Sequence, residues 1–483
     1  MTAGSSSSTV PVPQLPDAND TRVQRFDRRF PRGRIMLLLT ALVLVLNVTT
    51  TLRVEKVSAI DEQYWIDHLL HGAHFSIPRT GDPILQETVR EKCARGVEFD
   101  AFVPPCKKGH LDPRKYGYWH GIAVSGVGRP PFYFFVTGSI ASVLRASPID
   151  LPPNDSLVTW ARILGSAWLL VGFYFLLRIG EMLGVWRTML VVALIFVAAT
   201  PALLHADTIV NPDATALPSG AAVLFAALAW ERRGKGLWLV GLAALLGSAL
   251  GPKNSIAVIL VLAYFGMRAL ARATSSSDES DLRPWQDYAK AAVVVVVALF
   301  VANEGWDQLY SWGTQHGLFA PLLSVDVSHS PIAVSYGNRP VGFWRIFGLD
   351  TVFAMFPPFN DIAFPSQRLH LLYRTVARGA EYFAIGALVA VALRDKLSNK
   401  VAALGFATLI TLLVAPSLTV IRNSLQYGTF DQPVWRYGLA AIPGLVIVIA
   451  CAVRSRFSQI ALTVLTAALY VSALYVVFRP PAT

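Results

Sequence analysis

Long apolar runs alternate with short polar segments along most of the chain. The first run, from Ile35 to Leu52, contains no charged residue, and at about 1.5 Å per residue it nearly covers a hydrocarbon core of about 30 Å. Similar runs lie at about residues 157–177, 188–204, 214–230, 237–250, 254–270, 288–303, 376–393, 401–418, 435–453 and 458–478. The pattern predicts an all-α polytopic membrane protein with about 11 transmembrane helices.

One further run, from Pro130 to Leu144, is shorter and begins with two prolines. If it does not cross the membrane, the basic residues of the short loops all lie on the amino-terminal, cytoplasmic side, as the positive-inside rule requires. They are Arg178, Arg187, Arg232, Arg233, Lys235, Arg268, Arg272, Arg394, Lys396, Lys400, Arg454 and Arg456. We therefore expect this run to form an interfacial or re-entrant helix.

The remaining segments define the organisation of the chain. Residues 1–34 are rich in Ser, Pro and Thr and then in Arg, which predicts a disordered basic cytoplasmic tail. A cleaved signal peptide fits the sequence less well, because the charged region before the first apolar run is long and no small-x-small cleavage pattern follows that run. Residues 35–480 form the transmembrane domain. It includes a first external loop with interfacial helices, 53–156, and a second external loop, 304–375, so we expect any chemistry on the outer face.

Composition narrows the class of protein. Of 483 residues, 54% are apolar and 15% charged, whereas soluble domains are about a quarter charged. The net charge of +11 lies in short basic clusters between apolar runs, which predicts membrane orientation and no nucleic-acid partner. Cys93 and Cys106 share a polar region and could pair in an oxidising compartment, while Cys451 lies in an apolar run and is expected to be inert.

An acidic pair, Asp61-Glu62, lies soon after the first predicted span. Near the membrane surface, partial desolvation can raise a carboxylate pKa, or the pair can hold a divalent cation such as Mg²⁺ or Mn²⁺. A general base acting on an acceptor hydroxyl is one interpretation. A hydrated acidic pair on a loop is the alternative.

Two short predicted external turns also carry ionisable residues. The first contains His205, Asp207 and Asp213, and Asp213 follows Asn-Pro at the start of the next helix, where capping alone could explain it. The second is Gly251-Pro-Lys253, whose lysine lies on the side opposite to that favoured for snorkelling lysines. An anion such as a phosphate is a natural partner for Lys253.

The carboxyl-terminal half adds further basic and aromatic candidates. Arg436 enters an apolar run, where a guanidinium is costly unless paired. It could bind phosphate oxygens or form a structural ion pair with Asp431 or Asp61. The segment 304–375 holds Trp306, Tyr310, Trp312, His316, Tyr336, Arg339, Trp344 and Arg345. These aromatics could be membrane-interface anchors or could stack on sugar rings.

Taken in order, several motifs resemble those of the GT-C superfamily of membrane glycosyltransferases, in the style of protein mannosyltransferases, aminoarabinose transferases and related uncharacterised bacterial membrane proteins. They are Asp61-Glu62, Leu69-Leu-His-Gly72 with Pro78, Arg129-Pro-Pro-Phe-Tyr133, Arg162, Pro201, Asn211-Pro-Asp213, Gly251-Pro-Lys253, Gln432-Pro-Val-Trp-Arg-Tyr437 and Pro443. The chain departs from the family at Gly128-Arg129, where small-residue and His-Pro variants are usual.

The resemblance implies transfer of a sugar from a polyprenyl-phosphate donor to a glycan, lipid or protein of the cell envelope, on the outer face of the cytoplasmic membrane. It places Asp61, with Glu62, in the first-loop acid position that activates the acceptor. Lys253 and Arg436, with Arg339 and Arg345, would bind the donor phosphate. His205, Asp207, Asp213, Trp344 and Tyr437 would line the substrate site, and any metal would be held by Asp61 and Glu62.

Two other classes remain open. A transporter or flippase of a lipid-linked or anionic envelope precursor would fit the membrane architecture, although no inverted repeat is visible and the ionisable residues collect near helix ends. A noncatalytic partner in envelope assembly would keep the same fold.

Overall fold

The protein is an all-α polytopic membrane protein. The computed structural model describes residues 31–53, 56–58, 62–77, 84–97, 131–149, 156–274, 282–316, 367–394, 396–427 and 438–478. Within these ranges nearly all regular structure is helical, and the one β-type pairing is a bridge between Val57 and Val97.

Seven described helices are long and apolar enough to cross a membrane. They are α2 (Arg32–Arg53), α6 (Leu157–Met182), α9 (Ala216–Arg233, preceded by the 3-10 turn η2, Pro212–Thr215), α11 (Ile256–Thr274, preceded by η3, Pro252–Ser255), α12 (Trp285–Gln315), α17 (Gln367–Arg394) and α20 (Arg456–Phe478). Helices α7 (Arg187–Ala198) and α8 (Pro201–Thr208) are bent by 70° and together could make an eighth span.

Further apolar helices complete the bundle. They are α10 (Leu237–Leu250), α18 (Lys400–Tyr427), α19 (Ile442–Ala452, preceded by η5, Leu439–Ala441) and α5 (Phe132–Arg145). Each of the 11 predicted apolar runs thus coincides with a described helix or with the bent pair. The figure of 11 crossings remains a prediction, because the apolar stretches of α10, α18 (Lys400–Ala415) and α19 are each at most 17 residues long.

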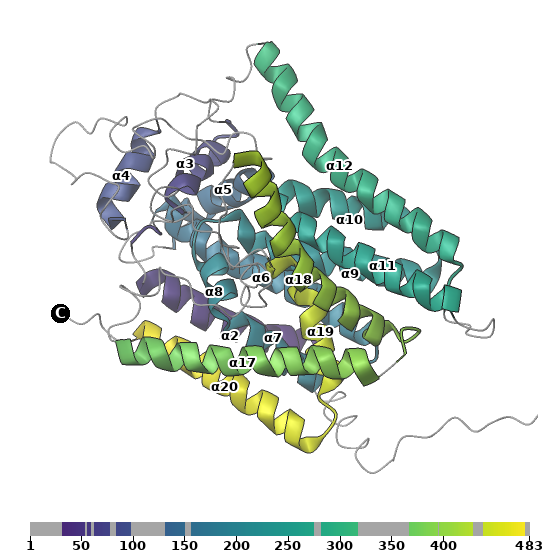
Figure 1. Cartoon of the computed structure of the whole chain (residues 1–483). Helices are drawn as coiled ribbons and strands as arrows, with labels where there is room; N and C mark the ends of the chain where they lie inside the picture. Colours follow the sequence, from purple (N-terminus) through teal and green to yellow (C-terminus); the bar gives the residue numbers. More distant parts are fainter. Residues whose placement is uncertain are drawn as a thin grey trace, which may run out of the picture.

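Helix α9 forms the centre of the bundle. Its most apolar window is 83% buried, against 22% for α12, which lies at the outer edge (Figure 1). A Cβ on Gly220 of α9 would lie 2.1 Å from the Ala440 carbonyl oxygen, so glycine allows η5 to approach the backbone of α9. The exposed apolar side chains of α12, such as Val293 and Phe300, suit a lipid-facing helix.

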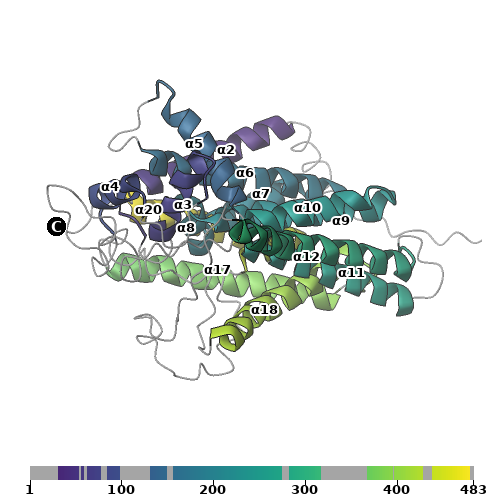
Figure 2. The ribbon, with the colours of Figure 1, turned by 90° about the horizontal axis from the view of Figure 1, so that it is seen from above.

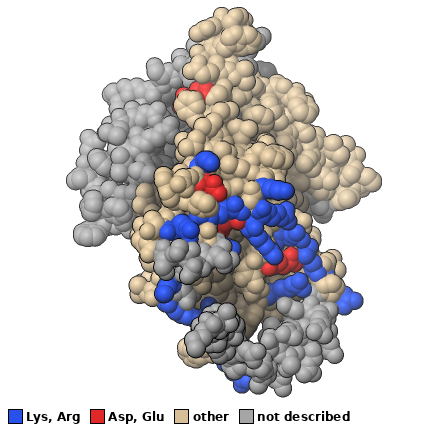
Figure 3. Space-filling view, turned by 90° about the vertical axis from the view of Figure 1, so that its right-hand side faces the viewer, with Lys and Arg blue, Asp and Glu red and all other residues tan. Residues whose placement is uncertain are grey.

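Basic residues mark one end of the bundle, which we call the basic end. Arg32 at the start of α2 forms an ion pair with Glu181 at the end of α6, with Nε and Oε1 2.7 Å apart. Helix α2 therefore begins at the same end of the bundle at which α6 ends. The chain lies at the opposite end when it leaves α2 and again when it enters α6, so the intervening α5 does not take it across. The face in Figure 3 carries a band of Lys and Arg side chains with few acidic ones.

Three short helices lie beside the opposite end, which we call the Lys253 end. They are α3 (Glu62–Ala73), α4 (Gln86–Arg95) and α5, and Figures 1 and 2 both show α3 and α4 away from α9 and α11. Gly72 and Gly138 allow α3 and α5 to pack closely, because a Cβ on either would lie within 3 Å of backbone atoms of the other helix.

The structure corrects several predicted boundaries. The run 188–204 is not one straight helix, because Pro201 starts α8 and has no N–H to continue the ladder of α7. His205 and Asp207 lie in α8 and not in a turn. Helix α12 continues to Gln315, so Trp306, Tyr310 and Trp312 belong to this helix and not to an irregular loop.

Candidate functional site

A buried ion pair joins the first loop to the start of α6. The Arg162 Nε and Nη2 atoms each lie 2.6 Å from a Glu62 carboxylate oxygen. The N–H groups of Val210 and Ser58 donate to the same carboxylate at 2.9 and 3.0 Å. Burial alone would raise the pKa of Glu62, but Arg162 and these two N–H groups lower it below its usual value. Glu62 is therefore an ionised anchor that fixes the first turn of α3.

Helix α8 brings two further ionisable side chains to this anchor. His205 and Asp207 are both buried, and His205 lies within the electrostatic influence of Glu62 and Arg162. Neither carboxylate oxygen of Asp207 has a hydrogen-bond partner among the residues that the structure describes. A buried carboxylate without such a partner is costly. Asp207 is therefore a strong candidate for a functional group.

A second ion pair connects the two 3-10 turns at this end. Lys253 Nζ of η3 lies 3.1 Å from Asp213 Oδ2 of η2. The Asn211 side chain accepts a hydrogen bond from the Asp213 N–H at 3.0 Å and so caps η2. The Asp213 side chain is 6% exposed and that of Lys253 is 21% exposed. The lysine is thus the more accessible member of the pair.

Asn254 fixes the position of Lys253. Its side-chain amide donates to Thr215 Oγ1 at 2.9 Å, Ser219 Oγ at 3.1 Å and the Gly247 carbonyl at 3.0 Å. These three acceptors belong to η2, α9 and α10, so one buried amide holds η3 against three elements. The sequence analysis did not predict this role. The available signal was a polar Asn254 directly after Gly-Pro-Lys, between two apolar runs.

Polar side chains connect α3, α4 and the start of α6. Arg95 donates to Ser156 Oγ at 2.7 Å, and Asp67 accepts hydrogen bonds from Thr88 Oγ1 at 2.6 Å and from the Leu85 N–H at 2.9 Å. Burial lowers the pKa of Lys92 to about 8, although the negative charge of Asp67 acts to raise it. These contacts attach α4 to α3 and to the start of α6.

The structure brings together several predicted site residues from separate motifs. Glu62, His205, Asp207, Asp213 and Lys253 all lie at the Lys253 end, on α3, α8, η2 and η3. Other predicted site residues lie outside the described residues: Asp61, Arg339, Trp344, Arg345, Arg436 and Tyr437. Within the described ranges no three His, Cys, Asp or Glu side chains gather as a metal site would require.

The remaining sequence candidates have other surroundings. Trp306 and Tyr310 are buried against Ile77, while Trp312 stacks on His316 with ring centroids 4.5 Å apart. Cys93 is disulfide-bonded and Cys451 is a free cysteine. The predicted partner Cys106 lies outside the described residues.

We expect Gly165→Ala to destabilise the site, because a Cβ there would lie 2.0 Å from the Asp207 carbonyl oxygen. Helix α8 would have to move away from α6, at a cost of about 1–3 kcal/mol. Thermal unfolding in detergent would measure it. Gly386→Ala in α17 is the matched control, since nothing lies within 4 Å of its Cβ position and alanine favours a helix. Equal unfolding temperatures for the two variants would contradict the close contact.

No model of a known protein family matches the chain, and no curated protein is detectably similar to it.

Proposed function

We propose that this chain is a membrane glycosyltransferase that transfers a sugar from a polyprenyl-phosphate donor to a hydroxyl of a cell-envelope glycan, lipid or protein. One observation carries the proposal: ionisable side chains from α3, α6, α8, η2 and η3 converge at one end of an apolar helical bundle. Ionisable groups within or beside membrane spans are costly and usually functional. The order of motifs that resembles GT-C enzymes supports the same class.

The donor phosphate binds Lys253 in this proposal. Asp213 neutralises the lysine before the donor arrives, and Asn254 holds it between the end of α10 and the start of α11. The diester phosphate of the donor competes for the partly exposed ammonium group, because its two free oxygens share one negative charge and both accept hydrogen bonds from a cation. Arg436, Arg339 and Arg345 are the other proposed phosphate ligands. His205, Asp207, Trp344 and Tyr437 contribute to the proposed sugar and acceptor site.

The proposed chemistry is a single displacement. The acceptor oxygen attacks the anomeric carbon, the bond from this carbon to the phosphate oxygen breaks, and the hydroxyl proton passes to Asp61. The phosphate leaves with the bonding electrons, and Lys253 stabilises the charge that develops on it. Glu62 is held by Arg162 and therefore acts as a positioning residue for the preceding Asp61. The displacement inverts the anomeric configuration.

We place the Lys253 end on the outer face of the cytoplasmic membrane. Two features support this orientation. Basic residues gather at the opposite end, as the positive-inside rule expects for the cytoplasmic side. Cys93 on α4 is disulfide-bonded, and disulfides persist in oxidising compartments.

Lys253→Ala and Asp61→Asn should each reduce sugar transfer by about 100-fold or more, because each removes a group that acts in the transition state. The assay uses purified full-length protein in liposomes, a panel of polyprenyl-phosphate hexoses and pentoses, and envelope extract as acceptor. The matched control is Lys290→Ala, which removes an exposed lysine paired with Asp287 at the basic end. Normal turnover in either site variant would remove that residue from the mechanism.

Deletion of the gene should also lead to accumulation of the donor lipid, and an unchanged lipid and glycan profile would contradict glycosyl transfer.

A transporter of a lipid-linked or anionic precursor is the second candidate. The break between α7 and α8 favours it, because transporters use discontinuous helices at their binding sites and α8 carries buried His205 and Asp207. The liposome assay separates the two classes. A transporter would move the intact donor lipid between leaflets without releasing polyprenyl phosphate, whereas the transferase releases it.

A further inference from the structure

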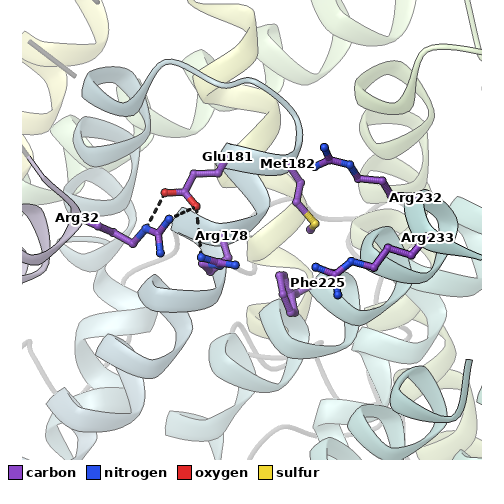
Figure 4. A pocket seen from close by; sticks show the side chains of 7 residues that line it. All are labelled: Arg32, Arg178, Glu181, Met182, Phe225, Arg232 and Arg233. Carbon is purple, nitrogen blue, oxygen red and sulfur yellow. Dashed lines mark hydrogen bonds and ion pairs between the residues drawn. The ribbon is translucent and has the colours of Figure 1, made fainter. Parts of the chain in front are cut away.

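A pocket of about 430 Å³ opens between the ends of α2, α6 and α9 at the basic end. It lies far along the bundle from Lys253, because α9 and α11 run from η2 and η3 to their basic last turns. Seven residues line it: Arg32, Arg178, Glu181, Met182, Phe225, Arg232 and Arg233 (Figure 4).

Positive charge exceeds negative charge in this pocket. Four arginines and one glutamate line it, so the formal charge is +3. Glu181 lies 2.7 Å from Arg32 and 3.7 Å from Arg178, and Arg187 approaches it from outside the lining at 3.5 Å. Arg232 and Arg233 are exposed and have no ion-pair partner among the described residues. The pocket thus has an unneutralised basic wall.

The pocket walls differ in character. Figure 4 shows Arg32, Arg178 and Glu181 on one side, Arg232 and Arg233 on the other, and the apolar side chains of Met182 and Phe225 between them. Guanidinium groups on two sides match the several oxygens of one phosphate group. An apolar floor beside them suits the carbon atoms attached to that phosphate.

Basic residues at this end have a simpler explanation, which is orientation in the membrane. Arg232 and Arg233 also lie in the last turn of α9, where a positive charge favours the helix dipole. Neither effect requires a hollow, nor arginines from three helices around it. Arg32 lies at the first turn of α2, where the dipole disfavours a cation, and is held there by Glu181. A hollow lined by arginines from three helices is therefore better explained by a bound anion.

We propose that this pocket is a binding site for a phosphate-bearing anion, held by Arg232 and Arg233 on one wall and by Arg32 and Arg178 on the other. Glu181 occupies part of the guanidinium surface in the absence of the anion and competes with it. Basic pockets between transmembrane helices commonly bind lipid phosphates. The site is independent of the proposed glycosyl transfer at the Lys253 end.

Native mass spectrometry of the full-length protein in detergent, with equal amounts of phosphatidylglycerol and phosphatidylcholine, tests the proposal. The wild type should prefer phosphatidylglycerol, and Arg232→Gln/Arg233→Gln should weaken that binding by about tenfold or more. The matched control Lys235→Gln/Arg272→Gln removes one positive charge from the turn after α9 and one from the last turn of α11. Both residues lie outside the pocket lining, so this variant should retain the preference. Equal loss in both double variants, or no loss in the first, would overturn the proposal.

Two further measurements sharpen the result. Glu181→Gln should tighten binding of phosphatidylglycerol several-fold, because it removes the internal competitor while leaving all four arginines. Weaker binding in this variant would contradict the proposed competition. Glycerol 3-phosphate then separates two sources of the phosphate. Displacement of the lipid by this soluble ester at equal concentration indicates a site for a soluble phosphate, and persistence of the lipid indicates a headgroup site.

Discussion

Arg162→Met will destabilise the folded protein by about 3–5 kcal/mol, because it leaves the Glu62 carboxylate buried without its counter-ion. Glu62→Gln will have a comparable effect, since it leaves the buried guanidinium uncompensated. The Glu62 side chain is 0% exposed and that of Arg162 is 1% exposed, so water cannot replace the lost partner. The double variant Glu62→Gln/Arg162→Met should cost less than the sum of the two single variants.

Thermal unfolding in detergent, followed by tryptophan fluorescence, measures these differences. The matched control is Glu87→Gln, which removes the carboxylate of an exposed ion pair with Arg145, 3.5 Å apart, beside the same end of the bundle. Exposed pairs contribute about 0–1 kcal/mol, so this control should change little. Additive effects of the two buried substitutions would contradict a direct ion pair.

Glu231→Gln will cause a second large loss of stability, again about 3–5 kcal/mol, because Arg268 would remain buried with an uncompensated charge. The Glu231 carboxylate accepts hydrogen bonds from Tyr264 Oη and Tyr288 Oη at 2.6 Å each and from Arg268 Nε at 2.7 Å. These donors lie on α11 and α12, so one carboxylate of α9 ties three helices at the basic end.

The same unfolding assay checks this network. Tyr264→Phe removes one hydrogen bond to the carboxylate and should cost about 1.5–3 kcal/mol, less than the loss of the charge. Asp287→Asn on α12 is the control, because this carboxylate is partly exposed and its contacts to Arg283 and Lys290 are 4.0 and 3.9 Å long. A variant Glu231→Gln that unfolds like Asp287→Asn would contradict the network.

The apolar pattern predicted the helices but not their interruptions. Each predicted run coincides with described helices, since a hydrocarbon core requires long apolar segments with internal hydrogen bonds. Hydropathy did not reveal the bend at Pro201, because the residues on both sides of it are apolar: Ala198 precedes it, and Leu203 and Leu204 follow it. The proline itself was the available signal.

The candidate site was predicted as separate motifs and not as an arrangement. Sequence reasoning singled out Glu62, Asp213 and Lys253 because ionisable residues beside apolar runs are unusual. It could not pair Glu62 with Arg162, which lies 100 residues away, because many arginines could have met that carboxylate. Lys253 was expected to bind an external anion such as a phosphate, and the structure shows that the Asp213 carboxylate already neutralises its charge.

The bend between α7 and α8 makes the position of the far end of α8 sensitive to the bend angle. Asp207 lies seven residues beyond Thr200, where α8 begins, which corresponds to about 10 Å at 1.5 Å per residue. A change of about 10° in the bend would therefore displace its carboxylate by almost 2 Å while the long helices stay in place. Displacements of about 1 Å can alter catalytic rates by about 100-fold. Mutations near Thr200 would thus adjust the proposed chemistry at the Lys253 end without touching any ionisable residue there.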